Sequence, residues 1–252
     1  MTSSGLRIEV RRRWFVGLLG VILGCAGSPT SAGDVSSLTI VGAAFAPCGG
    51  FTNAARANCA PRPEHGPPDS TVATGDPASL TIGMYALYIS PNDDCSSPVL
   101  VDDYGATASD KDLVANPVLF TGNPANGSYR CVMLKMSDVI RMKPLTSFGT
   151  CVAGTEYAGD IYRDGQTGWK DVDLNPIVGT GTDSLPADDH VTLFMTRDTS
   201  AVIARGVSGN QAITLGSDLV VPGTTTFFWN GQGSVVDEGG QCGINPGRPS
   251  FQ

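Results

Sequence analysis

Histidines and carboxylates are the side chains in this chain that could carry acid–base or nucleophilic chemistry. The sequence contains two histidines, His65 and His190. His65 lies in a Pro-rich stretch that would hold a catalytic base poorly, and His190 directly follows two aspartates. A serine hydrolase could pair His190 with a distant Ser and Asp, but no G-x-S-x-G turn is present to expose the nucleophile. We therefore expect no catalytic residues, with a hydrolase using His190 or carboxylates as the alternative.

Carboxylates spaced along residues 160–171 have the chemistry of a calcium site. Asp160, Asp164, Gly165 and Asp171 occupy positions 1, 5, 6 and 12 of an EF-hand loop. Position 3 is Tyr162, position 12 is Asp where bidentate Glu is usual, and neither flank has helical periodicity. We therefore expect an acidic loop between strands at 160–173, with calcium binding as the alternative and calcium as the one cofactor considered. Two further acidic pairs, Asp93–Asp94 and Asp102–Asp103, are either ligands or hydrated turns.

Seven cysteines support disulfide chemistry more than metal binding. Their spacing contains no C-x-x-C pair and no partnered histidines, which makes a zinc site a poor interpretation. Six of them can pair in fifteen ways, and the sequence does not select one. Our prediction is sequential pairing, and its last bond would restrain a C-terminal segment of low apolar content. The predicted pairs are Cys48–Cys59, Cys95–Cys131 and Cys151–Cys242.

The remaining cysteine, Cys25, ends a basic and then apolar N-terminal segment. Four arginines lie within residues 7–13, and the ten apolar residues 14–23 follow. At about 1.5 Å per residue, that run covers about half of a hydrocarbon core roughly 30 Å thick. The segment therefore predicts a signal peptide rather than a transmembrane helix. An ordinary secretory signal with an incidental Cys25 is the alternative.

Residues Ile22-Leu23-Gly24-Cys25 resemble the lipobox of bacterial lipoproteins. The resemblance covers the first tenth of the chain and implies cleavage before Cys25, acylation of that cysteine and attachment to a lipid bilayer. Ala26 and Gly27 lack the Asp that the family uses for inner-membrane retention, which implies an outer-membrane lipoprotein facing the periplasm or the cell surface. Arg12-Arg13-Trp14-Phe15 also resembles a twin-arginine signal, so the export route stays open between that pathway and general secretion.

Charge excludes nucleic acid as an expected partner. Residues 1–24 hold four of the 16 basic and one of the 24 acidic residues, which leaves 12 basic and 23 acidic residues and a net charge of −11. A polyanion would be repelled by that surface, and no Lys/Arg cluster remains to concentrate binding.

The chain divides into a signal peptide at 1–24, a flexible tether at 25–36 and one domain at 37–252. The tether is small and polar. The domain contains a Pro-rich loop at 47–77 and then short apolar runs between turn residues, which predicts an all-β, loop-rich, disulfide-braced antiparallel sandwich. The expected strands are 38–45, 80–89, 99–101, 118–120, 128–136, 191–196, 201–204, 212–215, 219–221 and 225–229.

Residues 126–131, Asn-Gly-Ser-Tyr-Arg-Cys, combine a turn signal with Gly-x-Tyr-x-Cys. This pattern resembles the tyrosine corner of immunoglobulin-like sandwiches and the late strands of transthyretin-like envelope lipoproteins. The immunoglobulin alternative fits less well, because the Cys95 to Cys131 separation of 36 is short and no Trp lies between them. Tyr129 could equally be a half-buried strand residue with its hydroxyl at the rim.

Together these patterns predict a membrane-anchored envelope lipoprotein that acts as a non-catalytic binding or structural module. Its expected partners, besides the bilayer reached through acylated Cys25, are another envelope protein or a glycan. The alternative is a secreted hydrolase built on carboxylates or His190.

Overall fold

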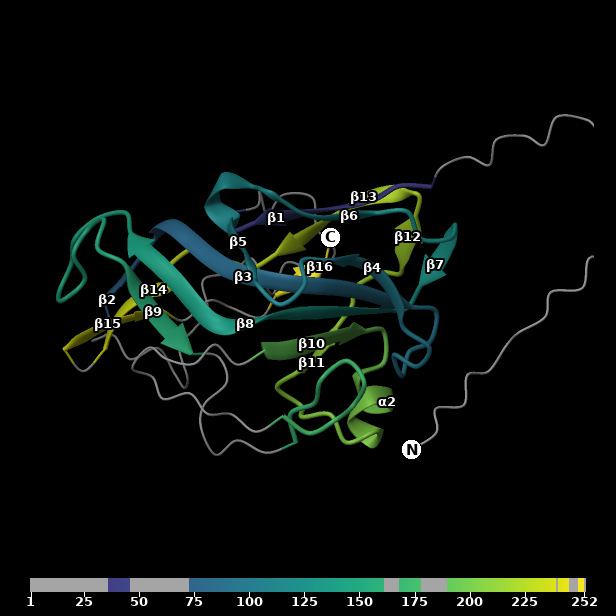
Figure 1. Ribbon diagram of the computed structural model, residues 1–252. Coiled ribbons are helices and arrows are strands. Elements are labelled where there is room, and N and C mark those ends of the chain that lie inside the picture. The colour runs from purple at the N-terminus through teal and green to yellow at the C-terminus, as the bar shows by residue number, and fades with distance from the viewer. Residues whose placement is uncertain are drawn as a thin grey trace, which may run out of the picture. The chain divides into compact units, whose positions relative to one another are not determined.

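The computed structural model describes residues 36–45, 73–160, 168–177, 190–238, 240–244 and 249–251. These residues form an all-β structure with several sheets and little helix, as predicted (Figure 1). No helix within these ranges is long and apolar enough to cross a membrane. Cys25, Cys48, Cys59, His65 and Asp164, together with most of the Pro-rich loop, lie outside the described residues.

Two sheets contain most of the strands. The four-stranded sheet has the order β16 (Ser250–Phe251), β13 (Gly223–Phe228), β1 (Leu38–Ala43) and β6 (Val118–Gly122). The seven-stranded sheet has the order β11 (Ala212–Thr214), β10 (His190–Thr196), β8 (Cys131–Pro144), β3 (Pro77–Ser90) and β4 (Val99–Asp103), with β5 (Ser109–Asp112) on β3 and β9 (Tyr157–Asp160) on β8.

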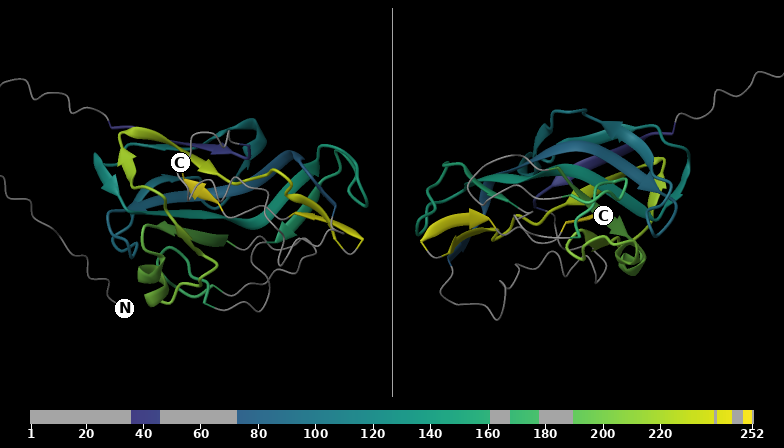
Figure 2. Two further views of the ribbon diagram at one scale, coloured as in Figure 1. Left: turned by 180° about the vertical axis from the view of Figure 1, so that it is seen from behind. Right: turned by 60° about the horizontal axis from the view of Figure 1, so that its bottom comes forward.

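Smaller elements lie at the two ends of these sheets. A two-stranded sheet consists of β7 (Gly127–Tyr129) and β12 (Leu219–Val221). A three-stranded sheet consists of β15 (Gln241–Ile244), β14 (Val235–Glu238) and β2 (Ala73–Gly75). The helices among the described residues are the 3₁₀ helix η2 (Leu113–Ala115) and α2 (Thr199–Ala204). Figures 1 and 2 place β14 and β15 at the end opposite α2 and β12.

One hydrophobic core receives side chains from both large sheets. Alternate residues of β8, among them Val132, Leu134 and Met136, point into it, as the two-residue period of a strand requires. Ile40 of β1 and Phe227 of β13 enter the same core from the four-stranded sheet. The opposite face of β8 carries a smaller apolar cluster that α2 covers. Its members are Cys95, Cys131, Met133, Phe194, Val202, Val207 and Ala212.

The prediction of purely antiparallel pairing is wrong in two places. β1 pairs with β13 in parallel, and β10 pairs with β11 in parallel. Sequence patterns within a strand report which side chains face the core, but not the direction of a partner strand far along the chain. All other strand pairs among the described residues are antiparallel.

The strand expected at 201–204 is also wrong, because these residues belong to helix α2. The Asp198 carboxylate accepts a hydrogen bond from the Ser200 amide and caps the helix. Within α2, Val202 is fully buried, whereas Ile203 is exposed. A four-residue apolar run is compatible with a helix or a strand, so its composition alone does not distinguish them. Here the Asp198 cap favours the helix.

The segment expected as one strand at 128–136 is interrupted at Arg130. β7 ends at Tyr129 and pairs with β12, and β8 begins at Cys131 in the large sheet. The Tyr129 ring is buried, and its hydroxyl donates a hydrogen bond to the Ala125 carbonyl oxygen at 2.7 Å. This bond to the backbone four residues upstream is the local geometry of a tyrosine corner.

Two of the predicted disulfides are present. Cys95 bonds Cys131 across 36 residues, and Cys151 bonds Cys242 across 91 residues. The first bond joins a loop to the beginning of β8, and the second joins the β8–β9 loop to β15. Each disulfide therefore restrains a loop at a different end of the large sheet.

Candidate functional site

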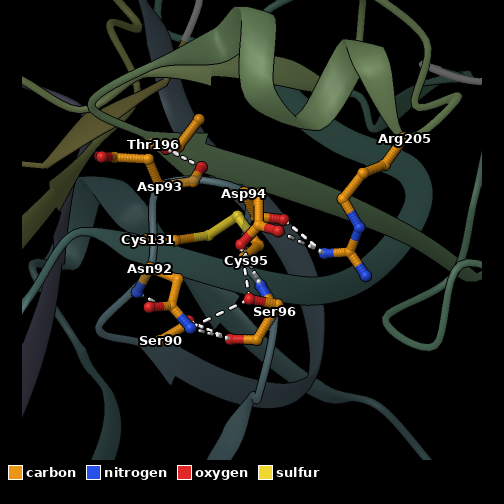
Figure 3. Close-up of polar contacts among 9 residues, drawn as sticks. All are labelled: Ser90, Asn92, Asp93, Asp94, Cys95, Ser96, Cys131, Thr196 and Arg205. Carbon is orange, nitrogen blue, oxygen red and sulfur yellow. Dashed lines mark hydrogen bonds and ion pairs between the residues drawn. A yellow bond between two sulfur atoms is a disulfide. The ribbon is translucent and has the colours of Figure 1, made fainter.

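Residues 91–98 form a loop between β3 and β4 that is fixed from several sides (Figure 3). Ser90, the last residue of β3, pairs with Cys131 on β8, and the Cys95–Cys131 disulfide then ties the loop to the same position. The Cα atoms of the two cysteines are 5.3 Å apart. The loop therefore begins beside Cys131 and is also anchored to Cys131, where the end of β3 meets the beginning of β8.

Hydrogen bonds within the loop fix its backbone. The Ser96 carbonyl oxygen accepts bonds from the Ser90 hydroxyl and from the Asn92 side-chain amide. Cys95 and Ser97 have φ values of 59° and 55°, in the left-handed region that non-glycine residues rarely adopt. Such backbone persists where surrounding contacts determine it, and here the disulfide and these bonds do so.

Asp93 is held by two neighbouring elements. Its carboxylate Oδ2 lies 2.8 Å from Arg130 Nη1, and its carbonyl oxygen accepts a hydrogen bond from the Thr196 hydroxyl at 2.5 Å. Thr196 is the last residue of β10 and is fully buried. Asp93 therefore connects the loop to the β7–β8 junction and to β10.

Asp94 is the more exposed acid of the pair. Its Oδ1 accepts hydrogen bonds from the Ser96 amide at 3.0 Å and the Ser96 hydroxyl at 2.6 Å. Arg205, at the end of α2, donates to the Asp94 carbonyl oxygen and lies 3.9 Å from its carboxylate. The two Ser96 bonds lower the pKa of Asp94, and the charge of Arg205 adds to that shift.

The result is a well-anchored surface loop whose two acids are each paired with an arginine from another element. Its acids face arginines from α2 and from the β7–β8 junction, and the side chains of Arg130 and Asp94 are 52% and 41% exposed. Exposed ion pairs contribute little to stability. The acids and arginines can therefore leave each other and bind polar groups of a partner at little cost in folding free energy. Carboxylates and guanidinium groups side by side can bind hydroxyl groups, amides or opposite charges.

Of the predicted calcium candidates, Asp164 lies outside the described residues, Asp160 is described by its backbone alone, and Asp171 is described with its side chain. Asp160 is the last residue of β9. Asp171 Oδ1 accepts hydrogen bonds from the Asp173 and Asn175 amides at 2.9 and 2.7 Å, which makes Asp171 the organiser of a turn. No cluster of three or more His, Cys, Asp or Glu that could hold a metal occurs in the described ranges.

The second acidic pair also organises backbone. Asp102 Oδ2 accepts a hydrogen bond from the Thr121 amide at 3.0 Å, and Asp103 Oδ1 accepts one from the Gly105 amide at 2.7 Å. Both aspartates therefore bond to the backbone of turns and neighbouring strands.

His190 is the first residue of β10 and lies opposite Ser137 of β8. Its ring packs against that of Tyr85 with centroids 3.9 Å apart, and Lys135 Nζ lies 5.6 Å from the Tyr85 centroid. On the same strand as Tyr85, burial raises the pKa of Tyr88, and the charges of Asp103 and Asp173 raise it further. His190 thus belongs to a mixed aromatic and basic group on the large sheet.

The arginines of the site were missed at the sequence level. Arg130 and Arg205 are 37 and 111 residues from their aspartate partners, and no local pattern signals such pairings. The signal that could have located Arg205 is the Asp198-Thr199-Ser200 cap, because it predicts a helix whose end carries this arginine.

Comparison with protein-family models, with curated proteins and with solved structures found no match for this chain.

Proposed function

We propose that this chain is a lipid-anchored protein of the bacterial cell envelope whose β domain is a non-catalytic binding or structural module. The observation that carries the proposal is the pair of disulfides, Cys95–Cys131 and Cys151–Cys242. Structural disulfides form and persist in oxidising compartments outside the cytoplasm. The basic and apolar leader ending at Cys25 supplies a matching export and acylation signal.

The proposed location is the outer membrane, with the domain facing the periplasm or the cell surface. Cys25 carries the lipid, and residues 26 and 27 are Ala and Gly rather than a retention Asp. Several acyl chains on one cysteine make the attachment effectively permanent, since each buried methylene adds about 0.8 kcal/mol.

The proposed binding element is the loop 91–98. A loop held by a disulfide and by hydrogen bonds loses little conformational entropy when a partner binds. Binding residues in proteins occur mostly on loops that a rigid scaffold positions. The acids of this loop and the arginines that pair with them fit a partner rich in polar groups, either another envelope protein or a glycan.

For the fold, the proposal is a sandwich of the transthyretin-like or immunoglobulin-like kind. The bond from the Tyr129 hydroxyl to Ala125, two residues before a disulfide cysteine, supports it. Two features depart from an immunoglobulin domain. Cys95–Cys131 joins a loop to a strand instead of joining two sheets, and β1 pairs in parallel with β13.

Mass spectrometry of the protein purified from its native membrane tests the anchor. The expected N-terminus is Cys25 with a diacylglycerol thioether and an amide-linked acyl chain. A Cys25→Ser variant provides the matched control and should keep its leader and lack lipid. An unmodified Cys25 thiol, or a wild-type leader still attached, would refute the anchor.

Affinity capture from envelope extracts tests the binding role. The acylated wild type should retain a protein or glycan partner that an Asp93→Asn/Asp94→Asn variant loses. Asp110→Asn is the control, because this exposed acid also pairs with an arginine, Arg141, but lies on β5. Hydrolase activity that His190→Gln abolishes, with no partner captured, would favour the hydrolase alternative.

A further inference from the structure

The chain enters the β domain at the end that carries the loop 91–98. The Ser36 hydroxyl donates a hydrogen bond to the Pro124 carbonyl oxygen at 2.9 Å. Six residues after Pro124 comes Arg130, which forms the ion pair with Asp93. Figure 1 shows the beginning of β1 at the same end as β7, β12 and α2.

Three of the four arginines in the described residues gather at this end. Each forms an ion pair with an aspartate, and their side chains remain 52%, 43% and 33% exposed. We call these three pairs the proximal rim. They are Arg130–Asp93 at 2.8 Å, Arg197–Asp218 at 3.3 Å and Arg205–Asp94 at 3.9 Å.

Charge is distributed unevenly between this rim and the rest of the domain. The described residues contain eight basic and 16 acidic side chains. The proximal rim, with the adjacent Asp198, holds three basic and four acidic ones, which leaves five basic and 12 acidic elsewhere. With Asp198, the rim therefore carries a net charge of −1, whereas the other described residues together carry −7, so an anionic surface repels the rim only weakly.

Exposed aliphatic side chains accompany the arginines. Among the described residues, eight large hydrophobic side chains are exposed, and four of these lie on elements that border the rim. They are Val99 and Leu100 on β4, Ile203 on α2 and Val220 on β12, with exposures of 42%, 50%, 46% and 57%. Arginine beside exposed aliphatic residues is the composition of a surface that rests at lipid headgroups.

We propose that the proximal rim docks on the phospholipid bilayer that holds acylated Cys25, with the arginines at headgroup phosphates. This inference rests on the proposed lipid anchor. Cys25 and Ser36 are 11 positions apart in the sequence. For the flexible tether that the sequence predicts here, that length corresponds to a root-mean-square span of about 18 Å, which would confine the rim close to the headgroups. Confinement raises its effective concentration at the surface and allows weak contacts to hold.

Hydrogen–deuterium exchange of the full acylated protein on vesicles tests the proposal. Vesicles of phosphatidylethanolamine and phosphatidylglycerol should slow exchange in peptides that cover 91–98, 197–205 and 218–221. Residues 145–156, at the opposite end, should exchange as in detergent solution. Replacing Arg130, Arg197 and Arg205 by Gln should weaken docking by about fivefold per arginine. Arg141→Gln is the matched control and should leave exchange unchanged.

The outcomes separate the two proposals. Acylated protein that floats with vesicles but shows no slowed exchange at the rim overturns the docking surface and leaves the anchor intact. Slowed exchange at 145–156 instead of the rim also overturns it. Wild-type protein that does not float with vesicles overturns the anchor and the docking surface together.

Discussion

Asp237 holds Thr150 through two hydrogen bonds at the end of the molecule that carries the Cys151–Cys242 disulfide. Its Oδ2 accepts from the Thr150 amide at 3.1 Å, and its Oδ1 accepts from the Thr150 hydroxyl at 2.6 Å. Gly149 precedes Thr150 with a φ of +50°, and a Cβ at that position would lie 1.6 Å from Asp237 Oδ2. The carboxylate thus occupies space that only glycine leaves open.

Gly149→Ala should destabilise the domain by about 2–4 kcal/mol, because left-handed strain adds to this overlap. Gly154→Ala is the matched control, since Gly154 also has a positive φ of +75° but has no atom within 4 Å of its Cβ position. Gly154→Ala should lower the free energy of unfolding by about 1 kcal/mol. Equilibrium urea unfolding under oxidising conditions measures both values, and equal costs would contradict the role given to Asp237.

Tyr129→Phe should lower the free energy of unfolding by about 1 kcal/mol. The substitution removes the hydroxyl that donates to Ala125, while the buried ring stays. Val220→Ala, on the paired strand β12 but facing solvent, should change stability by less than about 0.5 kcal/mol. A Tyr129→Phe variant as stable as wild type would show that the corner does not stabilise the fold.

The ionised form of Asp94 should support the loop 91–98 at neutral pH but not in acid. Its Ser96 bonds lower the folded-state pKa below that of the unfolded chain. The contribution is therefore complete above the ordinary Asp value, about 3.9, and is lost as pH falls through the folded value. The free energy of unfolding of wild type should exceed that of Asp94→Asn at pH 7, and this difference should become smaller as the pH is lowered to 3.

Carbon-13 NMR titration of the Asp94 carboxyl group tests the cause of that shift. Ser96→Ala removes the hydroxyl donor but keeps the Ser96 amide bond, so the pKa of Asp94 should move up toward its ordinary value. An unchanged pKa would show that the Ser96 hydroxyl does not cause the shift.

Asp198→Ala should destabilise helix α2 and shift the urea midpoint downward. Asp198 Oδ1 accepts a hydrogen bond from the Ser200 amide at 3.0 Å, and no other side chain is assigned as the cap. Asp198→Asn keeps an acceptor and should restore most of the loss, since Asn caps helices as well as Asp does. Equal loss in both variants would indicate that charge rather than capping matters.

Alternating apolar residues made β3, β8, β10 and β13 predictable, because their inward side chains fill one core. The length of β8 was underestimated. Ser137 and Asp138 are polar and read as the end of a strand, yet both are buried within β8, which continues to Pro144. Burial of polar residues in a strand depends on partners that a local pattern does not contain.

The candidate loop was predictable in part. The Asp93–Asp94 pair is visible in the sequence, and the Cys95–Cys131 bond was predicted as part of one of fifteen pairing schemes that the sequence left open. The arginines that complete the loop, and the parallel register of β1 on β13, depend on residues brought together from distant positions. Periodicity and spacing report local preference, so relationships of that range require the fold itself.

The position of β1 between β6 and β13 has a consequence for biogenesis. Leu38 of β1 pairs with Gly223 of β13, which lies 185 positions later in the sequence. The sheet that contains β1 therefore cannot be completed until β13 has been synthesised. Closure of so large a loop is slow, and a nascent chain that ends before β13 exposes the apolar edge of β1. Until β13 has been synthesised, β1 lacks its parallel partner in the four-stranded sheet.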